Sequence, residues 1–311
     1  MIRNGFVLQP SNELLPDYKI CPFSNSDLLF NRYLPDSNII EDYFTQRFFQ
    51  RKYQYTLNAR EAINIALLNF QLQPDDIVTI LTTTGNYYIS VCVTSEIEKY
   101  CKWSRAIEQK TKLLFVIHEF GYPYEGLQEL TRYKLPIIED CAYSFFTEDK
   151  SKNIGAIGDF AVYSFPKTFP LQLGGLLVSN SKTKMQESTF IGNAEKRYIK
   201  NVLSYYIQTK DQIMERRLIN HAHLSKKFRK LGLTERITLA DGIMPGVFMF
   251  RMNNHHIILT ELKKYFYAHG IQCSVFYGEE SFFIPIHQAL TEGDLDYFTE
   301  VMESFLSSQF E

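Results

Sequence analysis

Three apolar runs with polar residues or glycines at one end constrain the fold of this chain more than any other feature. One run ends in Asp140, the next ends in Ser164 and Lys167, and a third begins at the glycine pair Gly174–Gly175. Short apolar runs bounded in this way are typical of strands buried in a mostly parallel sheet. Parallel strands present their carboxyl ends at one edge. We therefore expect a carboxylate, a hydroxyl and an amine to meet at one edge of an α/β sheet.

These three groups are the ones that a pyridoxal 5'-phosphate (PLP) site requires. An amine such as that of Lys167 forms a Schiff base with the cofactor aldehyde. An acid such as Asp140 keeps the pyridine nitrogen protonated, so that the ring withdraws electrons from the reacting carbon. A hydroxyl such as that of Ser164 binds the phosphate, together with backbone N–H groups at a helix start. The sequence thus predicts PLP as cofactor, with Lys167 as the catalytic residue.

The same stretch resembles the DegT/DnrJ/EryC1/StrS sugar aminotransferases, which have the aspartate aminotransferase fold. Ile138–Ala142 matches the family's V-I-E-D-A-A, and Gly158-Asp159 matches its G-D. Lys167 stands seven residues before Gly174, the family's usual spacing, and three after Ser164, as in a shorter S-x-x-K form. The resemblance implies the PLP-dependent transferase fold type I. This fold has a large domain with a mostly parallel sheet and a small α+β C-terminal domain.

An earlier segment, Leu57–Leu68, resembles the family's S-G-T-A-A-L phosphate-binding helix start. Asn58 is a good N-cap, and the amides of Ala59 and Arg60 are then expected to point at the cofactor phosphate. Taken alone, the same residues describe a capped amphipathic helix without a ligand.

Four aromatic or imidazole side chains complete the predicted cofactor site. The family places an aromatic ring against the cofactor after its second strand, where Tyr87 fits best by register and Tyr88 follows. His118 begins a segment that resembles the family's V-H-x-Y-G-x-P loop. Tyr143 stands three residues after Asp140, where the family often has Gln or His. Considered separately, Tyr87, Tyr88 and His118 are each better explained by a structural role, and Tyr143 can still form a hydrogen bond.

The chain departs from the family pattern in two further places. Between the helix expected over residues 87–101 and the strand before His118, the family has a strand ending in an acid. Here only Lys102–Arg105 and a short linker stand there. The family's N-x-R motif after the glycine pair, which concerns substrate and partner subunit, is missing.

The pattern of elements predicts three parts. Residues 1–40 form a proline-punctuated N-terminal arm, residues 41–182 the large PLP-binding domain, and residues 183–311 a helical linker and small C-terminal domain. Helices are expected over residues 39–51, 185–231 and 291–305, with strands at 247–251 and 272–276. Arg216–Arg217 is assigned to a solvated face of the long helix.

Composition excludes several classes of protein. The net charge of -2 over 311 residues gives no sign of nucleic-acid binding. No run of 18 apolar residues exists, so no membrane span is expected. Five cysteines without a C-x-x-C pair argue against a zinc site or a disulfide framework, and predict reduced thiols in the cytoplasm. No metal is predicted.

The resemblance implies amino transfer to a keto sugar, attached to a nucleotide, from a donor such as glutamate, by a homodimer. Two alternatives stay open. One is a degenerate member that keeps the fold and serves binding or assembly, which the abridged segment and the missing motif favour. The other is an unrelated nucleotide-binding α/β enzyme, which the absence of G-x-G-x-x-G and G-x-x-x-x-G-K-[ST] disfavours.

Overall fold

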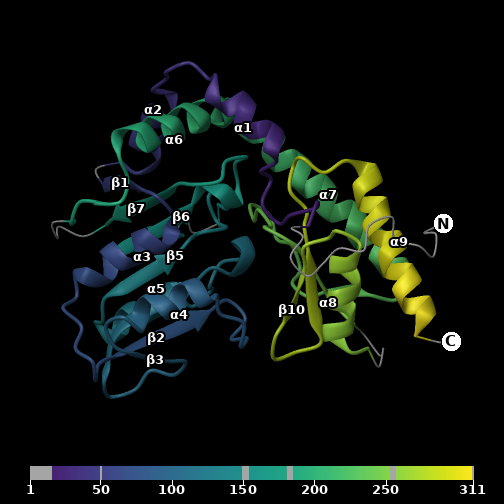
Figure 1. Ribbon diagram of the computed structural model, residues 1–311. Coiled ribbons are helices and arrows are strands. Elements are labelled where there is room, and N and C mark those ends of the chain that lie inside the picture. Colours follow the sequence, from purple (N-terminus) through teal and green to yellow (C-terminus); the bar gives the residue numbers. More distant parts are fainter. Residues whose placement is uncertain (1–15, 50, 149–153, 181–184, 253–256, 310–311) are drawn as a thin grey trace.

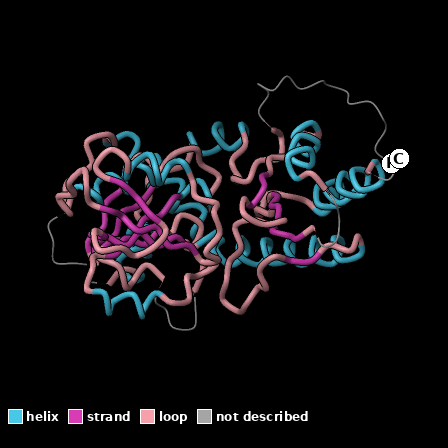
Figure 2. The backbone as a smooth tube through the Cα atoms, turned by 90° about the horizontal axis from the view of Figure 1, so that it is seen from below, coloured by secondary structure: helices cyan, strands magenta, loops and turns pink. Residues whose placement is uncertain are grey.

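The computed structural model describes residues 16–49, 51–148, 154–180, 185–252 and 257–309. Figure 1 shows two groups of strands, each with its own helices, and helix α7 (Lys210–Lys230) extends between them. The tube view in Figure 2 separates the same two groups. Within this described part, no helix is both long and apolar enough to cross a membrane.

The larger sheet has seven strands in the order β1-β7-β6-β5-β4-β2-β3. Only β7 runs antiparallel to its two neighbours. The predicted mostly parallel sheet is therefore confirmed. The strands are β1 (Lys52–Thr56), β2 (Ile77–Thr82), β3 (Lys102–Ser104), β4 (Thr111–Ile117), β5 (Ile137–Asp140), β6 (Phe160–Ser164) and β7 (Gly175–Ser179).

Apolar side chains cover both faces of this sheet. In β6, Val162 packs with the core under one face, whereas Ala161 and Tyr163 pack under the other. Because successive residues of a strand point to opposite faces, a strand covered on both sides must be apolar throughout. One face is covered by α3 (Ala59–Leu68) and α4 (Val91–Ile97), and the other by α2 (Ile39–Arg47), α6 (Asn193–Tyr206) and the short α5 (Leu127–Leu130).

The second sheet is antiparallel, in the order β10-β11-β9-β8. Thr291 caps the last helix with a capping box, because its hydroxyl accepts from the Asp294 N–H while the Asp294 carboxylate accepts from the Thr291 N–H. The elements here are β8 (Thr234–Glu235), β9 (Phe248–Arg251), α8 (Leu259–Ala268), β10 (Ser274–Phe276), β11 (Ser281–Ile284) and α9 (Glu292–Ser308).

Several predicted boundaries were wrong. The long helix expected over residues 185–231 begins only at Asn193, and a 3₁₀ turn at Ile207–Thr209 divides it. The helix expected from Tyr87 begins at Val91, because Ser90 caps it. The segment expected to be abridged forms strand β3 of only three residues, which pairs with β2 at the edge of the sheet.

The described part of the N-terminal segment packs on its own chain. The Tyr18 N–H donates to the Gly270 carbonyl at 2.9 Å, and the Tyr18 carbonyl accepts from Gln272 N–H at 2.8 Å. Helix α1 (Asn25–Arg32), which was not predicted, packs on α6, and Asn31 donates to the Pro170 carbonyl. Residues 1–15 lie outside the described residues. The division at residues 40 and 182 stays a prediction.

Candidate active site

A cavity of about 470 Å³ opens where the parallel strands end. All predicted site residues except Tyr87 line it. They come from the start of α3, the end of β5 and the end of β6, and from the segments after β2 and β4. The full set of lining residues is Asn58, Ala59, Arg60, Ile63, Tyr88, Ser90, Cys92, Val93, Ile117, His118, Glu119, Phe120, Asp140, Ala142, Tyr143, Ser164 and Lys167.

The first turn of α3 forms one wall of the cavity. The Asn58 side chain accepts from the Glu61 N–H at 3.0 Å, which caps the helix. The N–H groups of Ala59 and Arg60, one and two residues after the cap, have no partner within the helix. A helix start with free N–H groups at a cavity wall is a ready anion site.

The glycine pair allows β7 to lie against this helix start. A Cβ at Gly175 would stand 2.7 Å from Thr56 Oγ1 and 2.9 Å from the Ala59 nitrogen, closer than real Cβ atoms approach. Gly174 has φ of +112°, a conformation that other residues rarely adopt. Both glycines are therefore required by the backbone path beside the cavity.

Asp140 ends β5 with its carboxylate at the cavity, and its residue is 8% exposed. Its Oδ1 accepts from the Ala142 N–H at 2.9 Å. Burial raises the pKa of Asp140, and the Ala142 hydrogen bond offsets this only in part. A buried carboxylate of this kind favours a positively charged partner in the cavity.

Glu139, one residue earlier, points away from the cavity and serves the backbone. Its carboxylate accepts from the N–H groups of Gly155, Ile157 and Gly158 at 2.7, 2.9 and 2.6 Å. It also lies 3.0 Å from Nε2 of His118. The Glu139 side chain is fully buried. It therefore holds the segment before β6 in place rather than contacting a ligand.

Both ring nitrogens of His118 have partners inside the protein. Nδ1 accepts from the Tyr124 N–H at 3.0 Å, so the proton lies on Nε2, which donates to Glu139. The ring can therefore offer the cavity only its carbon atoms. His118 was predicted to bind the cofactor, and this geometry limits it to a packing contact.

Lys167 lies in a 3₁₀ turn directly after β6, and Pro166 helps to begin that turn. Its Nζ stands 5.0 Å from the centre of the Tyr143 ring. The electrostatic influence of Tyr143 raises the pKa of Lys167, although burial acts in the opposite direction. Burial raises the pKa of Tyr143. The amine thus lies over the Tyr143 ring, and both residues line the cavity.

Of the two neighbouring tyrosines, the structure places only Tyr88 in the cavity. Its ring packs near Phe120 and Phe283, and burial raises the pKa of its hydroxyl to about 12. Tyr87, which the register favoured, is 67% exposed, and the Arg105 guanidinium covers its ring at 4.9 Å. The choice of Tyr87 fails because the turn after Asn86, whose side chain accepts from the Tyr88 N–H, is not helical.

Arg217 was assigned to a solvated helix face, and this was wrong. The residue is 1% exposed. Its Nη2 donates to the Lys167 carbonyl at 2.8 Å, and its Nε donates to Gln288 Oε1 at 2.8 Å. Gln288 in turn donates to the Thr168 carbonyl at 2.9 Å. Helical spacing could have predicted the burial of Arg217, because residue 217 lies on the same helix face as the buried Ile213 and Leu224.

Comparison with known proteins identifies the family. Residues 41–208, more than half of the chain, match the DegT/DnrJ/EryC1/StrS aminotransferase family. The chain belongs to this family. A segment of 146 residues is 34% identical to GDP-perosamine synthase of Escherichia coli O157:H7 and covers 40% of each protein. A shorter segment is 31% identical to dTDP-3-amino-3,6-dideoxy-alpha-D-galactopyranose transaminase of Aneurinibacillus thermoaerophilus, covering 29% of this chain and 26% of that enzyme.

Solved structures show that the fold of this DegT/DnrJ/EryC1/StrS member extends over nearly the whole chain. The aminotransferase TlmJ from Streptoalloteichus hindustanus superposes with a TM-score of 0.72 at 16% identity, covering 92% of this chain and 95% of that one. The PMP form of the sugar aminotransferase Spr1654 from Streptococcus pneumoniae gives a TM-score of 0.67 at 14% identity, covering 94% and 98%. Fold type I, expected from the sequence, is thereby confirmed.

The Arg217 contact in this family member leads to a prediction about Lys167. Arg217→Met removes the donor that holds the Lys167 carbonyl, but it also removes a buried guanidinium whose pKa is lowered to about 10 by burial. The two effects on stability oppose each other. We expect the free energy of unfolding to change by less than about 2 kcal/mol and PLP affinity to fall about tenfold or more.

Urea unfolding and PLP titration measure the two quantities. Arg216→Met is the matched control, because Arg216 is only partly buried and donates to the Leu290 carbonyl, away from Lys167. Unchanged PLP affinity in Arg217→Met would show that the guanidinium does not position Lys167.

His287 of the same buried region makes stability depend on pH. Burial, with Arg217 nearby, lowers the pKa of His287 to about 3, whereas an unfolded histidine titrates near 6.5. Below about pH 6.5 His287 binds a proton in the unfolded chain but stays neutral in the folded chain. The free energy of unfolding therefore decreases as the pH is lowered, until the pH reaches the pKa of the folded state. We expect His287→Gln to reduce the slope of unfolding free energy between pH 6 and 4, by up to about 1.4 kcal/mol per pH unit. Urea unfolding at several pH values checks this, and an unchanged slope would contradict it.

Proposed function

We propose that this protein is a PLP-dependent aminotransferase that transfers an amino group to a keto sugar, attached to a nucleotide, with glutamate as a donor. The observation that carries the proposal is the shared cavity. The amine of Lys167, the buried carboxylate of Asp140 and the free N–H groups at the start of α3 all line it. These are the partners that the aldehyde, the ring nitrogen and the phosphate of PLP require.

The residues present fit this cofactor. Asp140 is desolvated and would pair with the protonated pyridine nitrogen. Ser164, with the amides of Ala59 and Arg60, would hold the phosphate. Tyr88, Tyr143 and His118 would pack around the ring. When bound, PLP supplies an electron-withdrawing ring that stabilises negative charge at the donor carbon.

Lys167 has two tasks in this proposal. Its Nζ would hold the cofactor through the cofactor aldehyde. The amine would also serve as the base that takes a proton from the carbon of the amino donor and then as the acid that returns it. The raised pKa of Lys167 means that the amine is protonated in the free protein. Before it could act as a nucleophile, the amine would have to lose that proton.

Both curated relatives named above act on nucleotide-linked sugars by their names, which supports the substrate class. The fold by itself does not choose the reaction. A solved structure of Escherichia coli GDP-4-keto-6-deoxy-D-mannose-3-dehydratase with bound PLP, which is named for a different reaction, superposes on this chain with a TM-score of 0.66. The degenerate-member alternative keeps its two supports, the shortened segment and the missing N-x-R motif, but the shortened segment still forms strand β3 in the sheet.

A spectroscopic titration tests the proposal. Addition of PLP should give a visible band, and borohydride should convert it into an adduct that mass spectrometry places on Lys167. Addition of glutamate should then change the band of the unreduced protein, and a nucleotide-linked keto sugar should restore it. Failure to bind PLP would overturn the cofactor. A bound cofactor that no amino donor changes would favour the degenerate member.

We also propose a cytoplasmic homodimer. All five cysteines are free thiols in the structure, which suits a reducing compartment. Large apolar side chains are exposed on and after α1, among them Leu28, Leu29, Phe30 and Tyr33, and such patches mark interaction surfaces. Light scattering should give twice the chain mass of 36.4 kDa, and Leu29→Glu with Phe30→Glu should weaken the dimer. A monomer that binds PLP fully would contradict this.

A further inference from the structure

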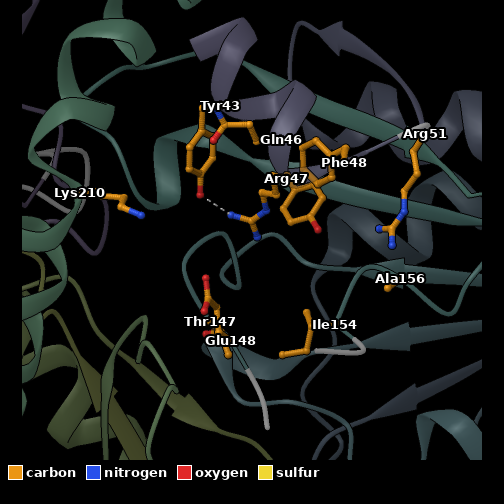
Figure 3. Close-up of a pocket in the computed structure, with 11 residues that line it drawn as sticks. Tyr43, Gln46, Arg47, Phe48, Arg51, Thr147, Glu148, Ile154, Ala156 and Lys210 are labelled. Atoms are coloured by element: carbon orange, nitrogen blue, oxygen red, sulfur yellow. Dashed lines mark hydrogen bonds between the residues drawn. The ribbon is translucent and has the colours of Figure 1, made fainter. Parts of the chain in front are cut away.

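A second cavity, of about 350 Å³, shares no lining residue with the candidate active site. Figure 3 shows it between α2, the residues after β5 and the first residue of α7. It is large enough for a small metabolite. Its lining residues are Tyr43, Gln46, Arg47, Phe48, Arg51, Thr147, Glu148, Ile154, Ala156, Tyr163 and Lys210.

The lining is strongly basic. Among the described lining residues, Arg47, Arg51 and Lys210 give three positive charges and Glu148 gives one negative charge, so their formal net charge is +2. Among the described residues, no carboxylate lies within ion-pair distance of any of the three cations. Cations gathered in a partly enclosed hollow raise the local potential for anions.

Arg47 is held in place by several neighbours at the wall of this cavity. Its Nη1 donates to the Tyr43 hydroxyl at 3.0 Å and to the Phe145 carbonyl. Its guanidinium carbon lies 4.7 Å from the centre of the Phe145 ring and 5.4 Å from that of Phe48. The Tyr163 side chain is a further hydrogen-bond partner of Arg47. The Arg47 side chain is therefore fixed in orientation at the wall of the cavity.

The other two cations lie around the same hollow (Figure 3). Arg51 donates to the Gly155 carbonyl at 3.1 Å, which fixes its direction. Lys210 Nζ lies 5.9 Å from the centre of the Tyr43 ring. The rings of Tyr43, Phe48 and Tyr163 add apolar surface to the wall. The hollow thus offers charge-assisted donors beside aromatic faces.

We propose that this cavity binds a small metabolite through a phosphate monoester. The dianion of such a group matches the formal charge of the lining. Arginine guanidinium groups recognise phosphate oxygens by paired hydrogen bonds, and the aromatic walls accommodate the carbon skeleton that bears the phosphate. A free phosphate ion has the same charge but leaves the aromatic surface uncovered.

Calorimetric titration with ribose 5-phosphate and with inorganic phosphate, at constant ionic strength, tests the site. Under the proposed function, Ser164 and the N–H groups at the start of α3 also bind phosphate. Each titration is therefore repeated in Ser164→Ala. We expect ribose 5-phosphate to bind in both proteins. Lys210→Met and Arg51→Met should each weaken it about tenfold or more, whereas Lys196→Met, an exposed lysine on α6 outside both cavities, should not.

The outcomes separate this site from the proposed active site. Binding that disappears in Ser164→Ala but persists in Lys210→Met and Arg51→Met would assign the phosphate to the candidate active site. That result would overturn the second site. Binding of inorganic phosphate alone would overturn the metabolite. Thermal unfolding of each variant confirms that it is folded. None of these results depends on catalytic activity.

Discussion

Lys167→Ala should abolish the covalent PLP adduct and reduce amino transfer by about three orders of magnitude or more. The variant loses the only side-chain amine that lines the cavity described here. It should stay folded, because the Lys167 backbone carbonyl keeps its hydrogen bond from Arg217. Non-covalent PLP binding should persist, since Asp140 and the start of α3 are unchanged.

Borohydride reduction followed by peptide mass spectrometry measures the adduct. Lys210→Ala is the matched control, because this lysine lies in the second cavity and not in the candidate active site. A reduced adduct on a different lysine in Lys167→Ala, with activity retained, would remove Lys167 from the catalytic position.

Glu139→Ala and Asp140→Ala should fail in different ways, although the two residues are adjacent. Glu139→Ala leaves three backbone N–H groups and the His118 ring without their acceptor. Each buried donor left unpaired costs about 1–3 kcal/mol, so we expect the free energy of unfolding to fall by at least about 4 kcal/mol. That loss is comparable with the whole stability of many domains.

Asp140→Ala should instead leave stability nearly unchanged. The Asp140 carboxylate accepts one backbone hydrogen bond. The loss of this bond is offset because the variant no longer buries a carboxyl group whose pKa is raised by burial. PLP affinity should fall by about a hundredfold or more, because the protonated ring nitrogen loses its charged partner. Urea unfolding and PLP titration on both variants distinguish the cases. Equal losses of stability would show that Glu139 and Asp140 have been assigned to the wrong tasks.

The sequence alone determined where the acid, the hydroxyl and the amine of the candidate site lie along the chain. Apolar runs predicted the strands of the larger sheet, and the residues at their ends predicted the acid, hydroxyl and amine of one cavity. This works because parallel strands in a sheet bring their carboxyl ends to one edge. Gly174 and Gly175 were recognised by motif, and the close approach of Gly175 to α3 explains why glycine is needed there.

The tertiary structure decided which member of each neighbouring pair faces the site. Successive residues of a strand point to opposite sides, so Asp140 faces the cavity while Glu139 faces the segment 155–158. Tyr88 lines the cavity and Tyr87 does not, because both residues lie in an irregular turn before α4 and do not follow helical spacing.

Only packing between distant segments revealed Arg217 and the second cavity. Helical spacing shows that residue 217 shares a face with apolar residues, but not that the Lys167 carbonyl lies opposite. The second cavity brings Arg47 and Arg51 together with Lys210, about 160 residues further along the chain. Local sequence patterns arise from backbone periodicity, which the chain carries at every position. Contacts between distant elements depend on how those elements pack, and no single segment contains that information.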